Sequence, residues 1–366
     1  MITKNWFSAD SPHRYFLCII FLVAALNVFV RLNFLPPTIS GDAHGYIDTA
    51  RLISGEKGEG LTLYPGRLLK PLTPLGILLF TPLFHGNMIA GFLALNTLCY
   101  VLLALAMYAL LLLFTTDRFL AMLGTLIFIS AYPVLEYGLN LFSDIGSWLL
   151  FVVAIFGAVR YYRDASWKNL SIALAAVVTG LLWKEYAVLA GIFFGLVICC
   201  EPTRSWKEKF ARIFLLGACS AVVIGIMQWI VYIQFHYTYI DFILEAASVS
   251  PVLTEHTPYF IAKSIFAVLL LGWGLVLAGL WHWRSIPRRD QYTLLMLLPP
   301  SLLCLFWTFV SSRLYYVMAP LLAILALHGL KTLSSRRLVQ VLATVVIILG
   351  SYTWLFASGT LRAFLQ

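Results

Sequence analysis

A short polar stretch follows the first long apolar run of the chain and carries several groups that could do acid–base chemistry. The stretch GDAHGYIDTARLISG, residues 41–55, contains Asp42, His44, Tyr46 and Asp48. A carboxylate that lies within hydrogen-bond reach of a hydroxyl can accept its proton as the hydroxyl attacks an electrophile. Asp42, the first acidic residue of the stretch, is therefore a candidate general base.

Two cations follow in the same segment, within YPGRLLKPLTPL at residues 64–75. Arg67 and Lys70 are three residues apart and close to an apolar run. Guanidinium and ammonium groups bind phosphate through charge-assisted hydrogen bonds. With the nearby carboxylates, this pair could clamp the phosphate of a lipid-linked substrate. It could also simply anchor the chain to lipid head groups.

Ionisable residues recur at three later points, each near the end of an apolar run. EYGLNLFSD contributes Glu136 and Asp144, WKEYA contributes Lys184 and Glu185, and SSRLYYVMAP contributes Arg313. Charged groups this close to hydrocarbon are costly and indicate functional sites by default. Structural roles also remain open, because Lys184 and Glu185 could neutralise each other and Arg313 could snorkel to the interface.

Residues 41–55 also allow a purely structural interpretation. Asp42 would cap a helix that ends at Gly55, Asp48 would pair with Arg51 one turn later, and His44 would be solvated. An apolar helix face would then rest on the membrane surface, formed by Tyr46, Ile47, Ala50 and Ile53. On the functional interpretation, four aromatic residues could stack on a sugar: Tyr46, Tyr64, Tyr237 and Tyr239.

The composition indicates that a membrane-embedded helical bundle positions these residues. Of 366 residues, 61% are hydrophobic and 11% are charged, against roughly a quarter charged in soluble domains. Apolar runs of this length suit bilayer-spanning helices and are too long and unalternated for barrel strands. All six cysteines lie within the runs, so no disulfide framework is predicted. Eleven spans are predicted, at residues 13–32, 88–114, 119–135, 144–162, 170–183, 187–200, 211–235, 262–282, 292–310, 314–330 and 338–357.

Two segments depart from the pattern of simple spans. Residues 71–84, PLTPLGILLFTPLF, are interrupted by Pro71, Pro74 and Pro82, which predicts a broken helix at or dipping into the interface. The runs on either side of Lys184 are short for full crossings and could form a partial hairpin.

The charge distribution predicts the orientation of the bundle. With the N-terminus in the cytoplasm, sixteen basic residues lie inside and nine outside, whereas six acidic residues lie inside and ten outside. This obeys the positive-inside rule, so the net charge of +9 reflects topology and nucleic acid is not a predicted partner. Residues 1–366 are predicted to form a single transmembrane domain. Within it, residues 1–200 carry a large outer loop at 33–87, and residues 201–366 carry a second at 236–261.

The order of these features resembles the GT-C superfamily of membrane glycosyltransferases, which includes protein O-mannosyltransferases and lipid A aminoarabinose transferases. One span precedes a long outer loop with an aspartate and YP.R...P; a broken helix, SD, KE and R.YYVMAP follow in turn. The resemblance covers the first two hundred residues best and lies in pattern and order. It implies that Asp42 is the catalytic base or lies beside it, and that a second acidic residue is Asp144 or, less well, Glu136.

The resemblance also implies a sugar donor carried on a polyprenyl phosphate or pyrophosphate. Many relatives have two adjacent acidic residues in the first loop, whereas here Ala43 and His44 follow Asp42. No cofactor is therefore required on this interpretation. A divalent metal remains possible, with Asp42 and His44 as its ligands.

Together with the predicted orientation, the resemblance implies a glycosyltransferase of hexosyl or pentosyl type that acts at the outer, periplasmic face of a bacterial inner membrane. Its acceptor would be a glycan, a lipid or a protein. Asp42 and Asp144 are the predicted catalytic residues. Two alternatives stay open: a flippase that moves lipid-linked sugars without chemistry, and a non-catalytic assembly subunit whose outer loops bind a partner. The predicted substrate-binding residues are His44, Tyr46, Tyr64, Arg67, Lys70, Glu136, Lys184, Glu185 and Arg313.

Overall fold

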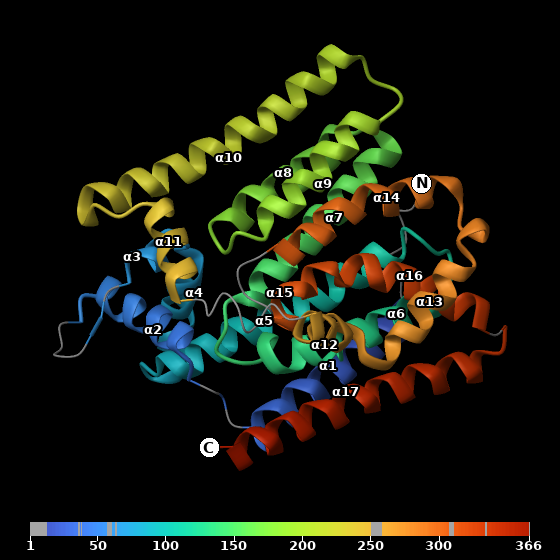
Figure 1. The fold of residues 1–366 in the computed structure, drawn as a ribbon, viewed down its shortest axis with the longest axis horizontal. Helices are drawn as coiled ribbons and strands as arrows, with labels where there is room; N and C mark the ends of the chain where they lie inside the picture. Colours follow the sequence, from blue (N-terminus) through green and yellow to red (C-terminus); the bar gives the residue numbers. More distant parts are fainter. Residues whose placement is uncertain are drawn as a thin grey trace.

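The computed structural model describes residues 13–35, 37, 39–56, 61–62, 64–249, 258–306, 311–333 and 335–365. Within these ranges every regular element is a helix (Figure 1). Seven helical segments are long and apolar enough to cross a membrane, so the chain is a multi-pass integral membrane protein, as predicted. They are α1 (His13–Phe34), α5 (Met88–Leu111), α7 (Asp144–Asp164), α10 (Trp206–Phe235), α12 to α13 (Pro258–Trp281), α15 to α16 (Ser312–Leu333) and α17 (Arg337–Leu365).

All eleven predicted spans contain helix, but four of the helices are shorter than a straight crossing requires. They are α6 (Arg118–Ile129), α8 (Trp167–Leu181), α9 (Ala187–Cys200) and α14 (Arg288–Leu303). A helix of the 15 residues of α8 is about 22 Å long, against roughly 30 Å of hydrocarbon. Helices α8 and α9 pack against each other as the predicted hairpin, with Lys184 in the turn between them. Residues 307–310 of the span predicted at 292–310 lie outside the described residues.

The predicted broken helix at residues 71–84 is present as α4 (Leu72–Phe80) followed by the 3-10 turn η1 (Thr81–Phe84). The chain reverses at His85 and Gly86, which both have positive φ angles of 53° and 86°. Glycine adopts this left-handed conformation without steric cost. Asn87 then begins α5 by accepting a hydrogen bond from the amide of Ala90.

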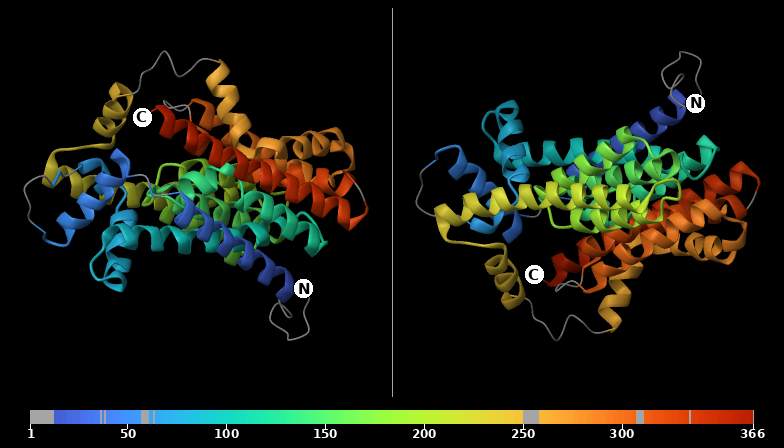
Figure 2. Two further views of the ribbon diagram at one scale, coloured as in Figure 1. Left: turned by 90° about the horizontal axis from the view of Figure 1, so that it is seen from below. Right: turned by 90° about the horizontal axis from the view of Figure 1, so that it is seen from above.

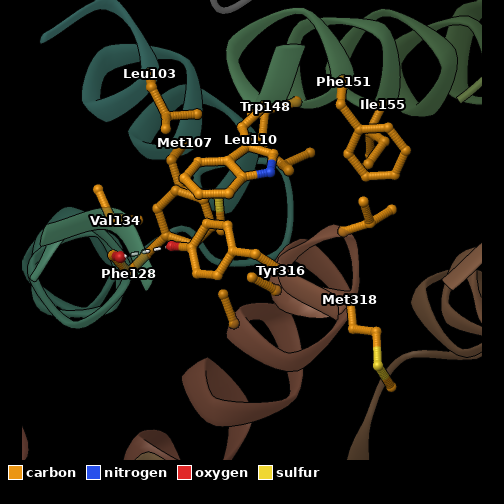
Figure 3. Packing of buried hydrophobic residues seen from close by; sticks show 14 of the residues in the cluster. Leu103, Met107, Leu110, Phe128, Val134, Trp148, Phe151, Ile155, Tyr316 and Met318 are labelled. Atoms are coloured by element: carbon orange, nitrogen blue, oxygen red, sulfur yellow. Dashed lines mark hydrogen bonds between the residues drawn. The ribbon is translucent and has the colours of Figure 1, made fainter. Parts of the chain in front are cut away.

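The buried core lies where α5, α6, α7 and the α15 to α16 segment meet. Figure 3 shows its centre, where Trp148 on α7 packs on Tyr316 with ring centroids 4.6 Å apart. The Tyr316 hydroxyl donates a hydrogen bond of 2.8 Å to the carbonyl of Phe128 on α6. A buried hydroxyl needs such a partner. This contact fixes the segment that begins with Arg313 against the centre of the bundle.

The two large segments that were predicted to form outer loops lie at one end of the bundle, opposite the N-terminus (Figures 1 and 2). The first segment forms the helices α2 (Gly41–Ile53), α3 (Pro65–Leu68) and α4, and the second forms α11 (Tyr239–Val249). Helix α10 runs along the outside of the molecule and contacts α3, α8 and α9. The fold therefore brings residues that are far apart in the sequence to the same end.

Candidate active site

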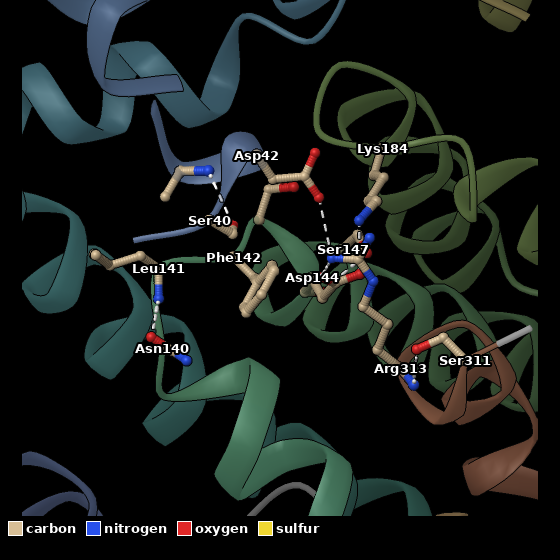
Figure 4. Close-up of polar contacts among 12 residues, drawn as sticks. Ser40, Asp42, Asn140, Leu141, Phe142, Asp144, Ser147, Lys184, Ser311 and Arg313 are labelled. Carbon is tan, nitrogen blue, oxygen red and sulfur yellow. Dashed lines mark hydrogen bonds and ion pairs between the residues drawn. The ribbon is translucent and has the colours of Figure 1, made fainter. Parts of the chain in front are cut away.

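Asp42 lies in the first turn of α2 and is held by two arginines. Ser40, rather than Asp42, is the N-cap, because its hydroxyl accepts a hydrogen bond from the amide of Ala43. The structural interpretation of Asp42 as a cap is therefore wrong. Its Oδ1 lies 2.5 Å from Nη2 of Arg67. Its Oδ2 lies 3.1 Å from Nη1 of Arg313, and Figure 4 shows this second contact.

Asp144 is the second carboxylate of the cluster and is fully buried at the start of α7. Its Oδ1 lies 2.6 Å from Nζ of Lys184 and accepts a hydrogen bond of 3.2 Å from the Tyr186 hydroxyl. Its Oδ2 lies 3.8 Å from Nη1 of Arg313. Arg313 thus lies between Asp42 and Asp144, and the early and late parts of the chain converge on one cluster (Figure 4).

Each cation of this region also lies against an aromatic ring. An aromatic face attracts a cation and limits its movement. The distances from the cationic group to the ring centroid are 4.6 Å for Arg67 on Tyr46, 5.0 Å for Arg313 on Phe142, 5.1 Å for Lys184 on Tyr186 and 3.9 Å for Lys70 on Phe242.

Tyr46 forms a rigid support beneath Arg67. The ring is buried, its edge packs against Phe92 on α5, and its hydroxyl accepts a hydrogen bond of 3.1 Å from Ser143. A Cβ at Gly45 would lie only 3.1 Å from Nε of Arg67, so glycine leaves room for the guanidinium. Because Arg67 already covers the face of Tyr46, the geometry favours a positioning role for this tyrosine over sugar stacking.

The apolar face of α2 is turned toward the bundle. Tyr46, Ile47 and Ala50 are buried in the hydrophobic core, whereas Ile53 is exposed. The interpretation that this face rests on the membrane surface is therefore wrong for its first three residues. The helix ends as predicted, because Gly55 follows it with a φ of 84°. Asp48 and Arg51 form the expected contact at 3.9 Å.

Lys70 and Glu185 form an ion pair beside the cluster, in which Lys70 is buried and Glu185 is partly buried. The pair joins the first outer segment to the turn between α8 and α9, and Phe242 on α11 covers it. The Tyr239 hydroxyl adds a hydrogen bond of 3.2 Å to the carbonyl of Leu69. Lys184 and Glu185 therefore do not neutralise each other as suggested, because each pairs with a different partner. In this arrangement Lys70 links its own segment, between α3 and α4, to the turn between α8 and α9 and to α11.

Three further residues were predicted to bind substrate, namely His44, Glu136 and Tyr64. His44 is exposed, and residues two apart on a helix do not face each other, so it is not brought to the side of Asp42. Among the described residues, no three His, Cys, Asp or Glu side chains are grouped to hold a metal ion. Glu136 is buried on η2 (Val134–Gly138), whereas Arg67 contacts Asp42, and Arg313 contacts Asp42 and Asp144. Tyr64 is half exposed and lies beside Gly45 and Arg67.

The cations of the cluster keep Asp42 and Glu185 ionised. Burial raises the pKa of Asp42, but the combined attraction of Arg67, Arg313 and Lys184 outweighs it and holds that pKa well below its usual range. Burial likewise raises the pKa of Glu185, but the charges of Lys70 and Lys184, together with the hydrogen bonds to its carboxylate, outweigh burial and lower that pKa. Both carboxylates are therefore charged at neutral pH.

Sequence reasoning missed four contributors: Phe142, Ser143, Tyr186 and Phe242. Three of them are immediate neighbours of predicted residues, since Phe142 and Ser143 precede Asp144 and Tyr186 follows Glu185. That adjacency is a usable signal. Phe242 lies on α11, far from Lys70 in the sequence, and nothing in the local pattern indicates the contact.

Comparisons with known proteins support the fold. No family model matches the sequence, and no curated protein matches it. The crystal structure of ArnT from Cupriavidus metallidurans bound to undecaprenyl phosphate superimposes with a TM-score of 0.65 at 17% identity, covering 92% of this chain and 64% of that chain. The apo structure of the same protein gives a TM-score of 0.62 at 18% identity, covering 90% and 62%. The chain thus spans slightly under two thirds of the length of ArnT. It has the membrane fold of ArnT, as the resemblance to the GT-C superfamily predicted.

Proposed function

We propose that this protein is a glycosyltransferase that moves a sugar from a polyprenyl phosphate carrier to an acceptor hydroxyl at one face of the membrane. The observation that carries the proposal is the convergence of Asp42, Asp144, Arg67, Lys184 and Arg313 on one partly exposed cluster. Transfer from a lipid phosphate requires a base for the acceptor and cations for the departing phosphate. Both are present within one set of contacts.

In the proposed reaction, Asp42 accepts the proton of the acceptor hydroxyl as its oxygen attacks the anomeric carbon. The new carbon–oxygen bond forms while the bond from the anomeric carbon to the phosphate oxygen breaks, and the bonding electrons leave with the phosphate. Arg67 and Arg313 stabilise the charge that develops there. Phosphate leaves readily, so no separate acid is needed. A single displacement of this kind inverts the anomeric centre.

Asp144 and its partners are assigned to the organisation of the cluster. Asp144 is fully buried and contacts Lys184, Tyr186 and Arg313, so it fixes two cations at once. Fixed dipoles and charges stabilise a transition state without the cost of reorganising during the reaction. Lys184 adds positive charge to the phosphate subsite, and the pair of Lys70 and Glu185 holds the surrounding segments in place.

The comparisons support a lipid phosphate as the carrier, because the ArnT structure with the same fold is bound to undecaprenyl phosphate. They support the chemistry of the carrier and leave the sugar and the acceptor as proposals. The orientation predicted from the basic residues places the cluster on the periplasmic side of a bacterial inner membrane. No metal is needed for the proposed step, and we expect chelation with EDTA to leave transfer unchanged.

Replacement of the base tests the proposal directly. We expect Asp42→Asn to lower sugar transfer from polyprenyl-phosphate donors by 10²-fold or more, since general-base catalysis contributes about 10²–10⁴-fold. Transfer would be followed by chromatography of radiolabelled products, with purified protein in proteoliposomes. The matched control is Asp48→Asn on the same helix, whose carboxylate contacts Arg51 outside the cluster.

Two outcomes would contradict the proposal. Unchanged turnover in Asp42→Asn would remove Asp42 from the mechanism. Movement of lipid-linked sugar across the vesicle membrane, with no new glycosidic product for any acceptor class, would instead favour a flippase.

A further inference from the structure

The cations of the candidate site are already held by carboxylates of the same chain. Asp42 holds Arg67 and Arg313, Asp144 holds Lys184, and Glu185 holds Lys70. A lipid phosphate that binds these cations must therefore compete with a carboxylate that is tethered beside them. Which carboxylate yields to the phosphate can be decided from burial.

The exposure of the side chains decreases across the cluster. The side chain of Asp42 is 30% exposed, and those of Arg313 and Arg67 are 24% and 20% exposed. Glu185 and Lys184 follow at 19% and 12%, and Lys70 and Asp144 are only 3% and 0% exposed. An anion that approaches the cluster meets the two arginines and Asp42 first. Asp42 is also the carboxylate with the most room to turn away.

From this arrangement we infer that Asp42 and the donor phosphate compete for the same two guanidinium groups, and that phosphate binding displaces Asp42 from Arg67 and Arg313. The inference rests on the proposed function and assigns the phosphate subsite to this arginine pair. Asp144 stays in place during the exchange because it is fully buried and keeps its contacts with Lys184 and Tyr186.

The exchange is chemically reasonable because both anions fit the same two guanidinium groups. In the donor the phosphate is a diester that carries one negative charge, as a carboxylate does, whereas the polyprenyl phosphate that transfer releases is a monoester that carries close to two at neutral pH. Arginine binds phosphate through two parallel hydrogen bonds, and charge-assisted bonds are about twice as strong as neutral ones. Tyr46 and Phe142 hold the two guanidinium groups from behind, so the groups stay in position while the anion in front of them changes.

The exchange would couple donor binding to the activity of the base. While Asp42 holds two arginines it is a weak proton acceptor, since opposite charges favour its ionised form. Once the phosphate takes the arginines, Asp42 becomes both free to reorient and more basic. Proton transfer to Asp42 is then available only with the donor in place.

Binding of a phosphate probe tests the exchange without any turnover. The probe is farnesyl phosphate, titrated by calorimetry against the full-length protein in detergent. We expect Asp42→Asn to bind the probe at least tenfold more tightly than the unsubstituted protein, because the competing carboxylate is gone. Arg67→Gln should bind at least tenfold more weakly. The double variant D42N/R67Q should lose the gain.

Asp48→Asn controls for net charge, since it removes one negative charge from the same helix without touching the arginine pair. We expect this variant to bind the probe like the unsubstituted protein. Equal or weaker binding in Asp42→Asn, an equal gain in Asp48→Asn, or no probe binding by any form would each overturn the exchange. These results are separate from the transfer assay, so the proposed function can fail or survive independently.

A second measurement uses the unsubstituted protein and does not depend on the folding of any variant. Water-soluble carbodiimide reacts with protonated carboxyl groups, and mass spectrometry locates the labelled residue. We expect farnesyl phosphate to increase the labelling rate of Asp42, because a carboxylate released from two guanidinium groups takes up a proton more readily. Unchanged or slower labelling of Asp42 would contradict the exchange.

Discussion

The two ends of the bundle use the same residue types in different ways. At the end opposite the candidate site, Arg163 on α7 contacts Asp290 at 3.2 Å, and Lys209 donates a hydrogen bond of 2.9 Å to the carbonyl of Cys199. Arg212 contacts the Tyr161 hydroxyl and lies 5.1 Å from the ring centroid of Trp167. Each of these cations joins one helix end to a neighbour, and none shares a carboxylate with another among the described residues.

At the candidate site, by contrast, cations from three separate segments converge. Asp42 is shared by Arg67 and Arg313, and Arg313 also lies near Asp144. Aromatic rings support cations at both ends, so an aromatic contact alone does not indicate a binding site. Convergence on shared carboxylates, rather than charge or burial, therefore distinguishes the candidate site from the contacts that link helices at the far end.

The largest expected effect is a difference in transfer activity between two variants. One removes Arg313 at the candidate site, and the other removes Arg212 at the far end. Arg313→Gln should lower transfer by about 10²–10³-fold, the cost of losing one group that stabilises developing charge. Arg212→Gln should leave the activity of the folded protein within about threefold of the original, because Arg212 contacts Tyr161 and Trp167 at the far end. Transfer rates would be normalised to folded protein measured by size-exclusion chromatography. Equal losses of transfer in both variants would contradict a role for Arg313 that Arg212 does not share.

Removing one partner of the ion pair between Lys70 and Glu185 should have a smaller effect, which is expected on stability. Breaking a buried ion pair by removing one partner costs about 3–5 kcal/mol, so Lys70→Met should lower the free energy of unfolding by about 3 kcal/mol. The double variant K70M/E185L should regain most of that loss, since no charge is left buried alone. Unfolding in mixed micelles gives both values. At the far end, Arg163→Met should cost less, because Arg163 is more exposed than Lys70.

The transfer activity of the double variant K70M/E185L tests whether Lys70 only links segments or also binds phosphate. If Lys70 is a tie between segments, K70M/E185L should retain transfer within about tenfold of the original. A loss as large as that of Arg313→Gln would place Lys70 among the phosphate ligands, as the sequence pattern first suggested.

Much of the architecture followed from the sequence because bilayer physics leaves few choices. The long apolar runs predicted the seven full-length spans, and Pro71, Pro74 and Pro82 predicted the break seen in α4 and η1. The four shorter helices were harder to judge, because an apolar run that is buried in protein looks like one that crosses lipid.

The sequence predicted which residues form the site, but only partly which of them pair with each other. Lys184 and Arg313 are predicted because charges near hydrocarbon are costly, whereas Asp42 is predicted as a base and Arg67 as a phosphate ligand. The structure brings these four residues together. Their pairing could not be predicted, since it depends on how α2, α7 and α15 pack. The sequence neighbours Lys184 and Glu185 illustrate this, because each chooses a partner from a distant segment.

The smallest expected effect is a difference in pH dependence between the two ends. The pKa of Asp42 is lowered because its cations outweigh burial, whereas burial raises the pKa of Asp290 by more than Arg163 and Arg289 lower it. A carboxylate with a lowered pKa contributes stability above its unfolded value of about 3.9 and loses it as the pH falls through the folded value. One with a raised pKa costs stability at neutral pH, and that cost is relieved as the pH falls.

Melting temperatures from pH 8 to pH 3.5 would reveal this difference in sign. The stability advantage of the unsubstituted protein over Asp42→Asn should stay constant down to about pH 5 and shrink below pH 4, where the unfolded carboxyl begins to bind protons. Relative to Asp290→Asn, the unsubstituted protein should instead improve as the pH falls toward 4. Parallel pH profiles for the two variants would mean that both carboxylates experience the same balance of burial and charge. The two arginines that contact Asp42 would then not distinguish it from Asp290, which links two helices through Arg163.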